Sequence, residues 1–124
     1  MGKYKAKKIA VAGVSNREEK YGFMIFRDLI KEGYDVSGIN PANGEVLGRK
    51  IYRNLRELPA APDLVITVVP SKITEEIVDI CRQIGTPEIW MQPGSESDEA
   101  VKKAEKYGIA VTYGACFMVR EGIW

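Results

Sequence analysis

Short apolar runs alternate along the chain with segments whose apolar residues recur every three or four positions. The runs are rich in β-branched residues, which favours buried strands. They predict five strands, at residues 8–12, 34–40, 63–69, 88–91 and 109–112. The stretch 64–69 is apolar almost throughout, which is typical of a central parallel strand that is covered on both faces.

Between these strands, apolar residues recur every three or four positions, which predicts helices. Apolar residues share one face of residues 21–32, and they do so again in a helix for which Ser71 is a suitable N-cap. A further helix is expected to open at Ser95, in an approximate capping box with Asp98.

This alternation predicts an α/β fold. We expect a Rossmann-like three-layer sandwich, in which a mostly parallel five-stranded sheet carries helices on both faces. Residues 42–49 are expected to form a loop, 51–58 to include one helical turn, and the apolar tail from Phe117 to pack back onto the domain. The chain has 124 residues and no linker or repeat, so we expect a single domain, 1–124.

Composition narrows the classes of partner. The net charge is +1, which gives no electrostatic reason to expect a nucleic-acid or membrane partner. No apolar run approaches the roughly 18 residues of a membrane span, and the basic start lacks the apolar segment of a secretory signal. The two cysteines have no close spacing, which fits a reducing compartment. We therefore expect a cytoplasmic protein, and we leave open whether it forms a homo-oligomer.

The chain contains no histidine, which removes the commonest general base and the commonest metal ligand. It also lacks the spaced motifs of dithiol redox sites, zinc proteases, serine hydrolases and Walker A loops. Ser15 has no visible partner that would activate it as a nucleophile. The sequence therefore predicts no catalytic residue and no metal site.

Turn residues follow every predicted strand at its carboxyl end, where open α/β sheets bind their ligands. The first strand is followed by Gly13, Val14, Ser15 and Asn16, whose backbone amides and adjoining helix dipole would suit a pyrophosphate. On this reasoning, Gly13→Val would abolish nucleotide binding and leave the fold intact. Taken alone, each turn is also explained as ordinary punctuation between a strand and a helix.

An NAD site fits the sequence less well than a site for another nucleotide. The first loop reads Gly13-x-Ser15, with the next glycine at Gly22, rather than G-x-G-x-x-G. The second strand ends in Asn40 instead of an acid that would bind a ribose hydroxyl, and Asp35 lies at the start of that strand. Asn40 has no charge that would repel a phosphate group beside the ribose.

An ordered set of segments resembles the small CoA-binding proteins, which are similar to the CoA-binding domain of the succinyl-CoA synthetase α subunit. The segments are IAVAGVSN at 9–16, GYDV at 33–36, INP at 39–41, GRKIY at 48–52, DLV at 63–65 and QPG at 92–94. The resemblance covers residues 8 to 120 and implies three contacts with CoA. The first loop would hold the pyrophosphate, the Asn-Pro and Val-Pro turns would flank the adenosine, and the glutamine turn would lie toward the pantetheine arm. The residues that would take these roles are Gly13, Val14, Ser15, Asn16, Asn40, Pro41, Val69, Pro70, Gln92 and Gly94.

Cations near these turns would pair with the phosphates of CoA. The candidates are Arg17 and Lys20 in the first loop, Arg49 and Lys50 after the second strand and, less directly, Lys72. Each is also explained as a solvated surface charge. Cys116 stands where the pantetheine thiol would arrive, although an inert cysteine is the simpler interpretation, and Cys81 falls on an apolar helix stripe of the core.

Three functions are compatible with these residues. The first is a CoA-binding protein that holds CoA or an acyl-CoA without catalytic residues of its own. The alternative is an NAD(H)-binding oxidoreductase or redox-sensing domain on the same fold. The third is a structural or regulatory protein whose crevice is vestigial and empty. The resemblance does not imply ligase activity, because that reaction uses a phosphohistidine and a second domain.

Overall fold

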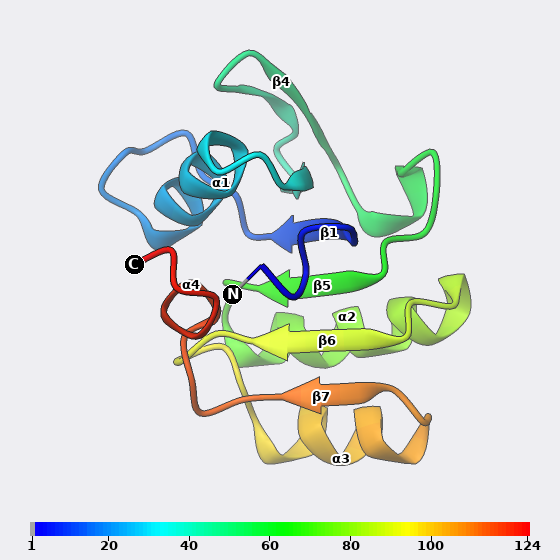
Figure 1. The fold of residues 1–124 in the computed structure, drawn as a ribbon. Coiled ribbons are helices and arrows are strands. Elements are labelled where there is room, and N and C mark those ends of the chain that lie inside the picture. The colour runs from blue at the N-terminus through cyan, green and yellow to red at the C-terminus, as the bar shows by residue number, and fades with distance from the viewer. Residues whose placement is uncertain (1) are drawn as a thin grey trace.

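One seven-stranded sheet with helices on both faces makes up the fold in a computed structural model, which describes residues 2–124 (Figure 1). The strands are β1 (Lys8–Ala12), β2 (Asp35–Ile39), β3 (Gly44–Val46), β4 (Arg49–Tyr52), β5 (Leu64–Thr67), β6 (Glu88–Met91) and β7 (Ala110–Thr112). The helices are α1 (Tyr21–Lys31), the 3-10 helix η1 (Leu55–Glu57), α2 (Ser71–Ile84), α3 (Asp98–Lys106) and α4 (Phe117–Arg120). The predicted α/β, Rossmann-like class is therefore confirmed.

The sheet order is β3-β4-β2-β1-β5-β6-β7, and all neighbouring strands are parallel except β3, which pairs antiparallel with β4. The chain moves from β1 to β2 on one side and later returns to β5 on the other side, so the strand order reverses between β1 and β5. Figure 1 shows β1, β5, β6 and β7 pointing to one edge. The loops that leave β1 and β5 therefore flank the crevice in which open α/β sheets bind ligands.

The expected count of five strands is wrong, because residues 42–49 and 51–58 contain the hairpin β3–β4. Its two-residue turn consists of Leu47 (φ 54°) and Gly48 (φ 74°), and two positive φ values in succession are the signature of a type I′ turn. Leucine rarely adopts a positive φ, and this turn usually carries Asn or Gly at the Leu47 position. Of the two turn residues, only Gly48 therefore indicates a hairpin in the sequence. The single helical turn expected in this region is present as η1, with Leu55 buried.

Two helices begin differently from the prediction. The N-cap of α2 is Pro70, and Ser71 is the first helical residue. The N-cap of α3 is Ser97, whose side chain accepts a hydrogen bond from a backbone N–H in the first turn. Ser95 does not cap α3, because it is buried and its hydroxyl lies 2.7 Å from the carbonyl oxygen of Gln92 and 3.0 Å from that of Thr67. The β6 turn and the end of β5 thus hold the hydroxyl that the local capping motif would use.

Alternate residues of the central strands enter two apolar layers. Ile9 packs on the side of α1 and α4, whereas the next residue, Ala10, packs on the side of α2 and α3. Phe117 is fully buried, which confirms that the tail packs back onto the domain, and Cys81 is fully buried in α2 as predicted. The two layers fix the helices against the two faces of the sheet.

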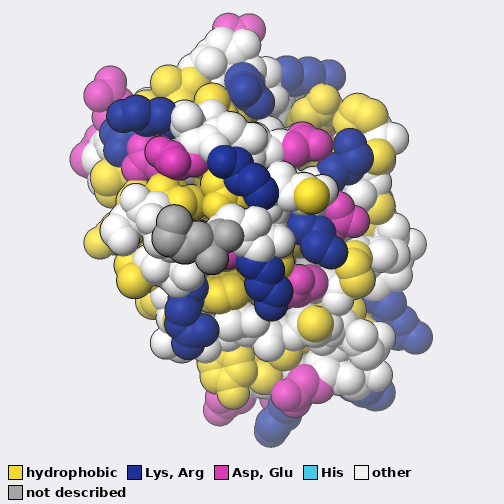
Figure 2. Space-filling model, viewed as in Figure 1, with side chains coloured by type: hydrophobic (Ala, Val, Ile, Leu, Met, Phe, Trp, Pro, Cys, Tyr) yellow, Lys and Arg dark blue, Asp and Glu magenta, His cyan; other side chains and the backbone are white. Residues whose placement is uncertain are grey.

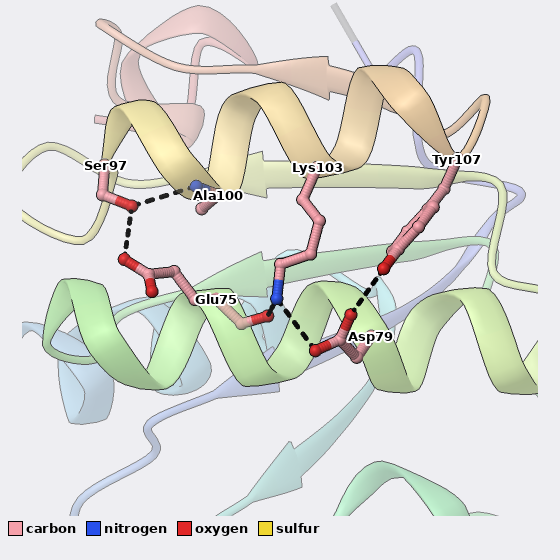
Figure 3. Close-up of polar contacts among 6 residues, drawn as sticks. All are labelled: Glu75, Asp79, Ser97, Ala100, Lys103 and Tyr107. Carbon is pink, nitrogen blue, oxygen red and sulfur yellow. Dashed lines mark hydrogen bonds and ion pairs between the residues drawn. The ribbon is translucent and has the colours of Figure 1, made fainter.

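A polar network joins α3 to α2 (Figure 3). Lys103 lies between the two helices and donates to a carboxylate oxygen of Asp79 at 2.8 Å and to the carbonyl oxygen of Glu75 at 2.9 Å. Tyr107 donates to the other oxygen of Asp79 at 2.9 Å. The hydrogen bond from Lys103 lowers the pKa of Asp79. This network keeps α3 aligned with α2.

Charges of both signs share the surface. On the face seen in Figure 2, Lys and Arg side chains alternate with Asp and Glu side chains. This mixture agrees with the net charge of +1. No helix among residues 2–124 is long and apolar enough to span a membrane.

A buried carboxylate ties the end of the chain to its beginning. Glu121 accepts a hydrogen bond from the Tyr34 hydroxyl at 2.8 Å and a longer one from the backbone N–H of Tyr4 at 3.4 Å. Burial, and then the bond to Glu121, raises the pKa of Tyr34 to about 12. The Tyr4 hydroxyl donates to Glu88 at 2.6 Å, and burial raises the pKa of Tyr4 as well.

We expect the free energy of unfolding to fall as the pH rises from 10 to 12, because a raised tyrosine pKa stabilises the fold only while the hydroxyl is protonated. The Tyr34 share of this loss should be about 2 kcal/mol. Tyr34→Phe should be less stable at pH 7 and should lose less stability above pH 10, as measured by urea unfolding at several pH values. Tyr113→Phe is the control because Tyr113 is exposed. An unchanged slope in Tyr34→Phe would contradict this assignment.

Candidate functional site

The loop after β1 rests directly on the end of β5. Gly13 has φ +111°, and a Cβ there would lie 2.8 Å from the carbonyl carbon of Val68, 2.9 Å from Val69 Cγ1 and closer still to the Val68 oxygen. A side chain at this position would therefore enter the protein backbone rather than a phosphate site. The expectation that Gly13→Val leaves the fold intact is wrong.

Gly22, in the first turn of α1, is a site residue that the sequence reasoning missed. A Cβ on Gly22 would lie 3.0 Å from the carbonyl carbon of Gly13 and closer still to its oxygen. The start of α1 therefore packs backbone to backbone on the loop after β1. In dinucleotide-binding loops the last glycine of the fingerprint allows the same close approach. The sequence could have indicated this role of Gly22 by comparison with that fingerprint. The role is not predicted because Gly22 lies farther from Gly13 than the fingerprint requires.

Only the second half of the loop has free donors. The N–H groups of Gly13 and Val14 both donate to the carbonyl oxygen of Ile39, at 2.9 and 3.2 Å. Within residues 2–124, the N–H groups of Ser15 and Asn16 have no acceptor, and no side chain caps α1. The predicted four-residue cradle is thus reduced to two amides and the first turn of α1, which together suit an anion.

The two helices beside the reversal point lack side-chain caps. No side chain bonds to the first N–H groups of α1 or of α2, which begins directly after the β5 turn at Pro70. By contrast, Ser97 caps α3, which follows β6 farther from the reversal point. Free helix N-termini therefore gather at the crevice between β1 and β5.

Ser15 and Asn16, together with Asn40 and residues of the β3–β4 hairpin, line a hollow of about 220 Å³. Two further hollows lie on either side of the end of β5. The first, which we call the α2 slot, has a volume of about 190 Å³. It is lined by Ala12, Gly13, Ile39, Pro41, Arg53, Asn54, Leu55, Val69, Ile73, Glu76, Ile77 and Ile80. The second, which we call the α4 cleft, has a volume of about 480 Å³ and is lined by Tyr21, Val68, Gln92, Pro93, Cys116 and Trp124. Val68 lines the cleft and the next residue, Val69, lines the slot, so the end of β5 separates them.

Asn40 fastens the β2 turn to the first loop. Its side-chain nitrogen donates to the carbonyl oxygen of Val14 at 2.7 Å, and its oxygen accepts from the N–H of Ala42 at 2.8 Å. Both ends of the amide are therefore used within the protein. The sequence indicates that Asn40 is uncharged. The structure shows that its side chain also positions the loop after β1.

Asn40→Asp should lower the free energy of unfolding by about 2 kcal/mol, because a carboxylate loses the donor and faces the carbonyl oxygen of Val14. Urea unfolding at pH 7 measures this. Asn54→Asp is the matched control, because Asn54 caps η1 only as an acceptor, from the N–H of Arg56. Equal stability of the two variants would rule out the bridging role.

The β6 turn shapes the α4 cleft through Gln92. The buried Gln92 side chain accepts from the N–H of Phe117 at 2.6 Å and donates to Cys116 Sγ at 3.4 Å. The rings of Tyr21 and Trp124, 6.2 Å apart, form an aromatic side of the same cleft. Gly94 lines neither hollow, and its N–H donates to Glu96 at 2.8 Å.

The predicted cations divide into two groups. Arg17 lies in the first loop but forms an ion pair with Glu19 at 2.8 Å, and Lys20 is the exposed N-cap of α1. Lys72 is exposed in the first turn of α2. Arg49 and Lys50 lie away from the loop after β1. Because the next two residues of β4 pair with the last two of β2, Arg49 and Lys50 lie beside the amino half of β2. The cation that follows β4 and lines the α2 slot is Arg53, which the sequence reasoning missed.

Comparison with known protein families matches residues 7–121 to the family described as the CoA binding domain. The chain belongs to this CoA-binding domain family. The resemblance to small CoA-binding proteins that the sequence indicated is therefore confirmed.

Relatives of this CoA-binding domain include parts of larger enzymes and small separate proteins. The α subunit of an ADP-forming acetate–CoA ligase II from Pyrococcus furiosus is 32% identical over 119 residues, which is 87% of this chain and 26% of that subunit. A conserved hypothetical protein from the same organism has a solved structure with a TM-score of 0.88 and 38% identity, and the match covers 92% of this chain and 98% of that one.

A dinucleotide-forming acetyl-coenzyme A synthetase 1 from Ca. Korarchaeum cryptofilum, solved with phosphate and ADP, is similar with a TM-score of 0.77 and 29% identity. The match covers 89% of this chain and 26% of that one. The chain thus spans about a quarter of each ligase or synthetase chain described here. It is a CoA-binding domain of the type found in these enzymes.

Proposed function

We propose that the protein binds CoA or an acyl-CoA across the carboxyl edge of the sheet, without chemistry of its own. The observation that carries this proposal is the loop after β1, whose amides at Ser15 and Asn16 are free; its first residue, Gly13, lines the α2 slot, and Tyr21 at the start of α1 lines the α4 cleft. CoA has the matching order of parts, because its diphosphate joins an adenosine to a pantetheine arm. Membership of the CoA-binding domain family supports the same ligand.

The adenosine is assigned to the α2 slot, where Pro41 and Val69 offer apolar contacts and Pro70 rigidifies the turn. The diphosphate is assigned to the loop of Gly13, Val14, Ser15 and Asn16, with Lys20 and Arg17 as nearby charges. Gly13 and Val14 support this loop through their packing and their bonds to the β2 strand. Asn40 positions the loop by its bond to a carbonyl oxygen.

The pantetheine arm is assigned to the α4 cleft. Gln92 holds Cys116 and the start of α4 in place, and the aromatic pair Tyr21 and Trp124 offers apolar contact to the arm. Gly94 keeps a role only in the shape of the β6 turn, where its φ of +94° favours glycine. Both cysteines are unpaired, which is consistent with work in a reducing, cytoplasmic compartment.

Calorimetric titration of the purified chain with CoA, acetyl-CoA and NADH tests the proposal. We expect binding of CoA with a dissociation constant of about 1 µM or lower, which corresponds to about 8 kcal/mol of binding free energy. NADH should bind far more weakly. If NADH bound tightly and CoA did not bind, the result would favour the oxidoreductase or redox-sensing alternative. If neither ligand bound, the result would favour a protein with an empty crevice.

A further inference from the structure

Arg53 reaches the α2 slot because β4 runs parallel to β2. The N–H of Asn40 donates to the carbonyl oxygen of Tyr52 at 2.9 Å, so the chain leaves β4 next to the point where it leaves β2. Arg53 is the following residue and lines the slot together with Pro41.

The guanidinium of Arg53 is available to a ligand. Within residues 2–124, the Arg53 side chain makes no ion pair or hydrogen bond, although its backbone N–H donates to Glu57 at 3.3 Å. The nearby Arg56 is different, because it donates to Gln83 at 3.1 Å. Among the described residues that line the slot, Arg53 is the one cation and Glu76 is the one carboxylate. An anionic group in the slot would therefore be drawn to Arg53 and away from α2.

We infer that Arg53 binds the 3′-phosphate of the CoA adenosine, an inference that rests on the proposed function. With the adenine between Pro41 and Val69 and the diphosphate at the first loop, the ribose that joins them lies at the mouth of the slot. Its 3′-phosphate must avoid the carboxylate of Glu76, which leaves the side of Arg53. The planar guanidinium binds a phosphate with two parallel hydrogen bonds. The protein therefore distinguishes CoA from dephospho-CoA.

The experiment is calorimetric titration of three proteins with CoA and with dephospho-CoA. The wild type should bind CoA about tenfold more tightly than dephospho-CoA, as expected for one partly exposed charge-assisted pair. Arg53→Gln should lose that preference through weaker CoA binding, with dephospho-CoA binding unchanged. Arg56→Gln, the matched control outside the slot, should keep the wild-type preference.

The outcomes separate this inference from the proposed function. Equal wild-type affinity for the two ligands, or an equal loss of both in Arg53→Gln, would overturn the assignment of Arg53 while CoA binding stands. Retention of the full preference in Arg53→Gln would also overturn it. Failure of the wild type to bind CoA would overturn the proposed function and this inference together.

Discussion

Replacing Gly13 by alanine should lower the free energy of unfolding by about 4 kcal/mol, which is a large part of the 5–15 kcal/mol of a typical domain. Two costs add. A non-glycine residue is strained at a φ of +111°, and the new methyl group would press into the carbonyl of Val68. Urea unfolding followed by circular dichroism measures the loss, and CoA binding should fail because the loop is displaced.

Gly44→Ala is the matched control for the clash. Gly44 has a φ of +92°, and nothing lies within 4 Å of a Cβ built on it. Its substitution should therefore carry the conformational cost alone, about 1–2 kcal/mol. Similar losses in both variants would show that close packing between the loop and β5 is unimportant.

Ser15→Asp should weaken CoA binding by about 100-fold and leave the fold intact. An aspartate keeps the local bond, because its carboxylate can accept from the N–H of Arg17 as the Ser15 hydroxyl does at 3.0 Å. It also places a negative charge beside the free amides, where repulsion of a diphosphate at about 4 Å amounts to a few kcal/mol near a protein surface. Calorimetric titration with CoA measures the effect.

Ser15→Asn is the control, because asparagine makes the same turn without the charge. It should bind CoA within about threefold of the wild type, and the gap between the two variants should narrow as salt screens the repulsion. If Ser15→Asp bound CoA as well as Ser15→Asn does, the diphosphate would have to lie elsewhere.

The sequence predicts those parts of the fold that rest on long apolar patterns. The continuous run in β5 and the helical stripe of α2 correspond to elements whose burial matches their pattern. The hairpin β3–β4 escapes prediction, because its strands are short and Leu47 occupies a turn position that usually carries asparagine or glycine. The start of α3 is not predicted for another reason. The Ser95 hydroxyl is held by carbonyl oxygens of the β6 turn and of β5, and a contact between distant segments is invisible in a local motif.

The candidate site shows the same division. The carboxyl ends of the strands, and hence the general place of Ser15, Pro41 and Gln92, follow from the alternation of strands and helices. The register between β2 and β4 does not, and that register decides that Arg53 reaches the slot while Arg49 stays beside the amino half of β2. The hydrogen bonds that occupy the N–H of Gly13 likewise depend on a neighbouring strand. The sequence indicates which groups could donate hydrogen bonds to a ligand. Only the pairing of the strands shows which of these donors are free.

The carbonyl of Ile39, which accepts from two successive amides, has a consequence for the thermodynamics of recognition. Under the proposed function, the half of the loop that Ile39 holds is already ordered before CoA arrives, so binding forfeits little backbone entropy at that point. On that proposal the Gly13–Val14 half of the loop is a preorganised platform, and the entropy that remains to be lost lies in the amides of Ser15 and Asn16, which have no acceptor within residues 2–124.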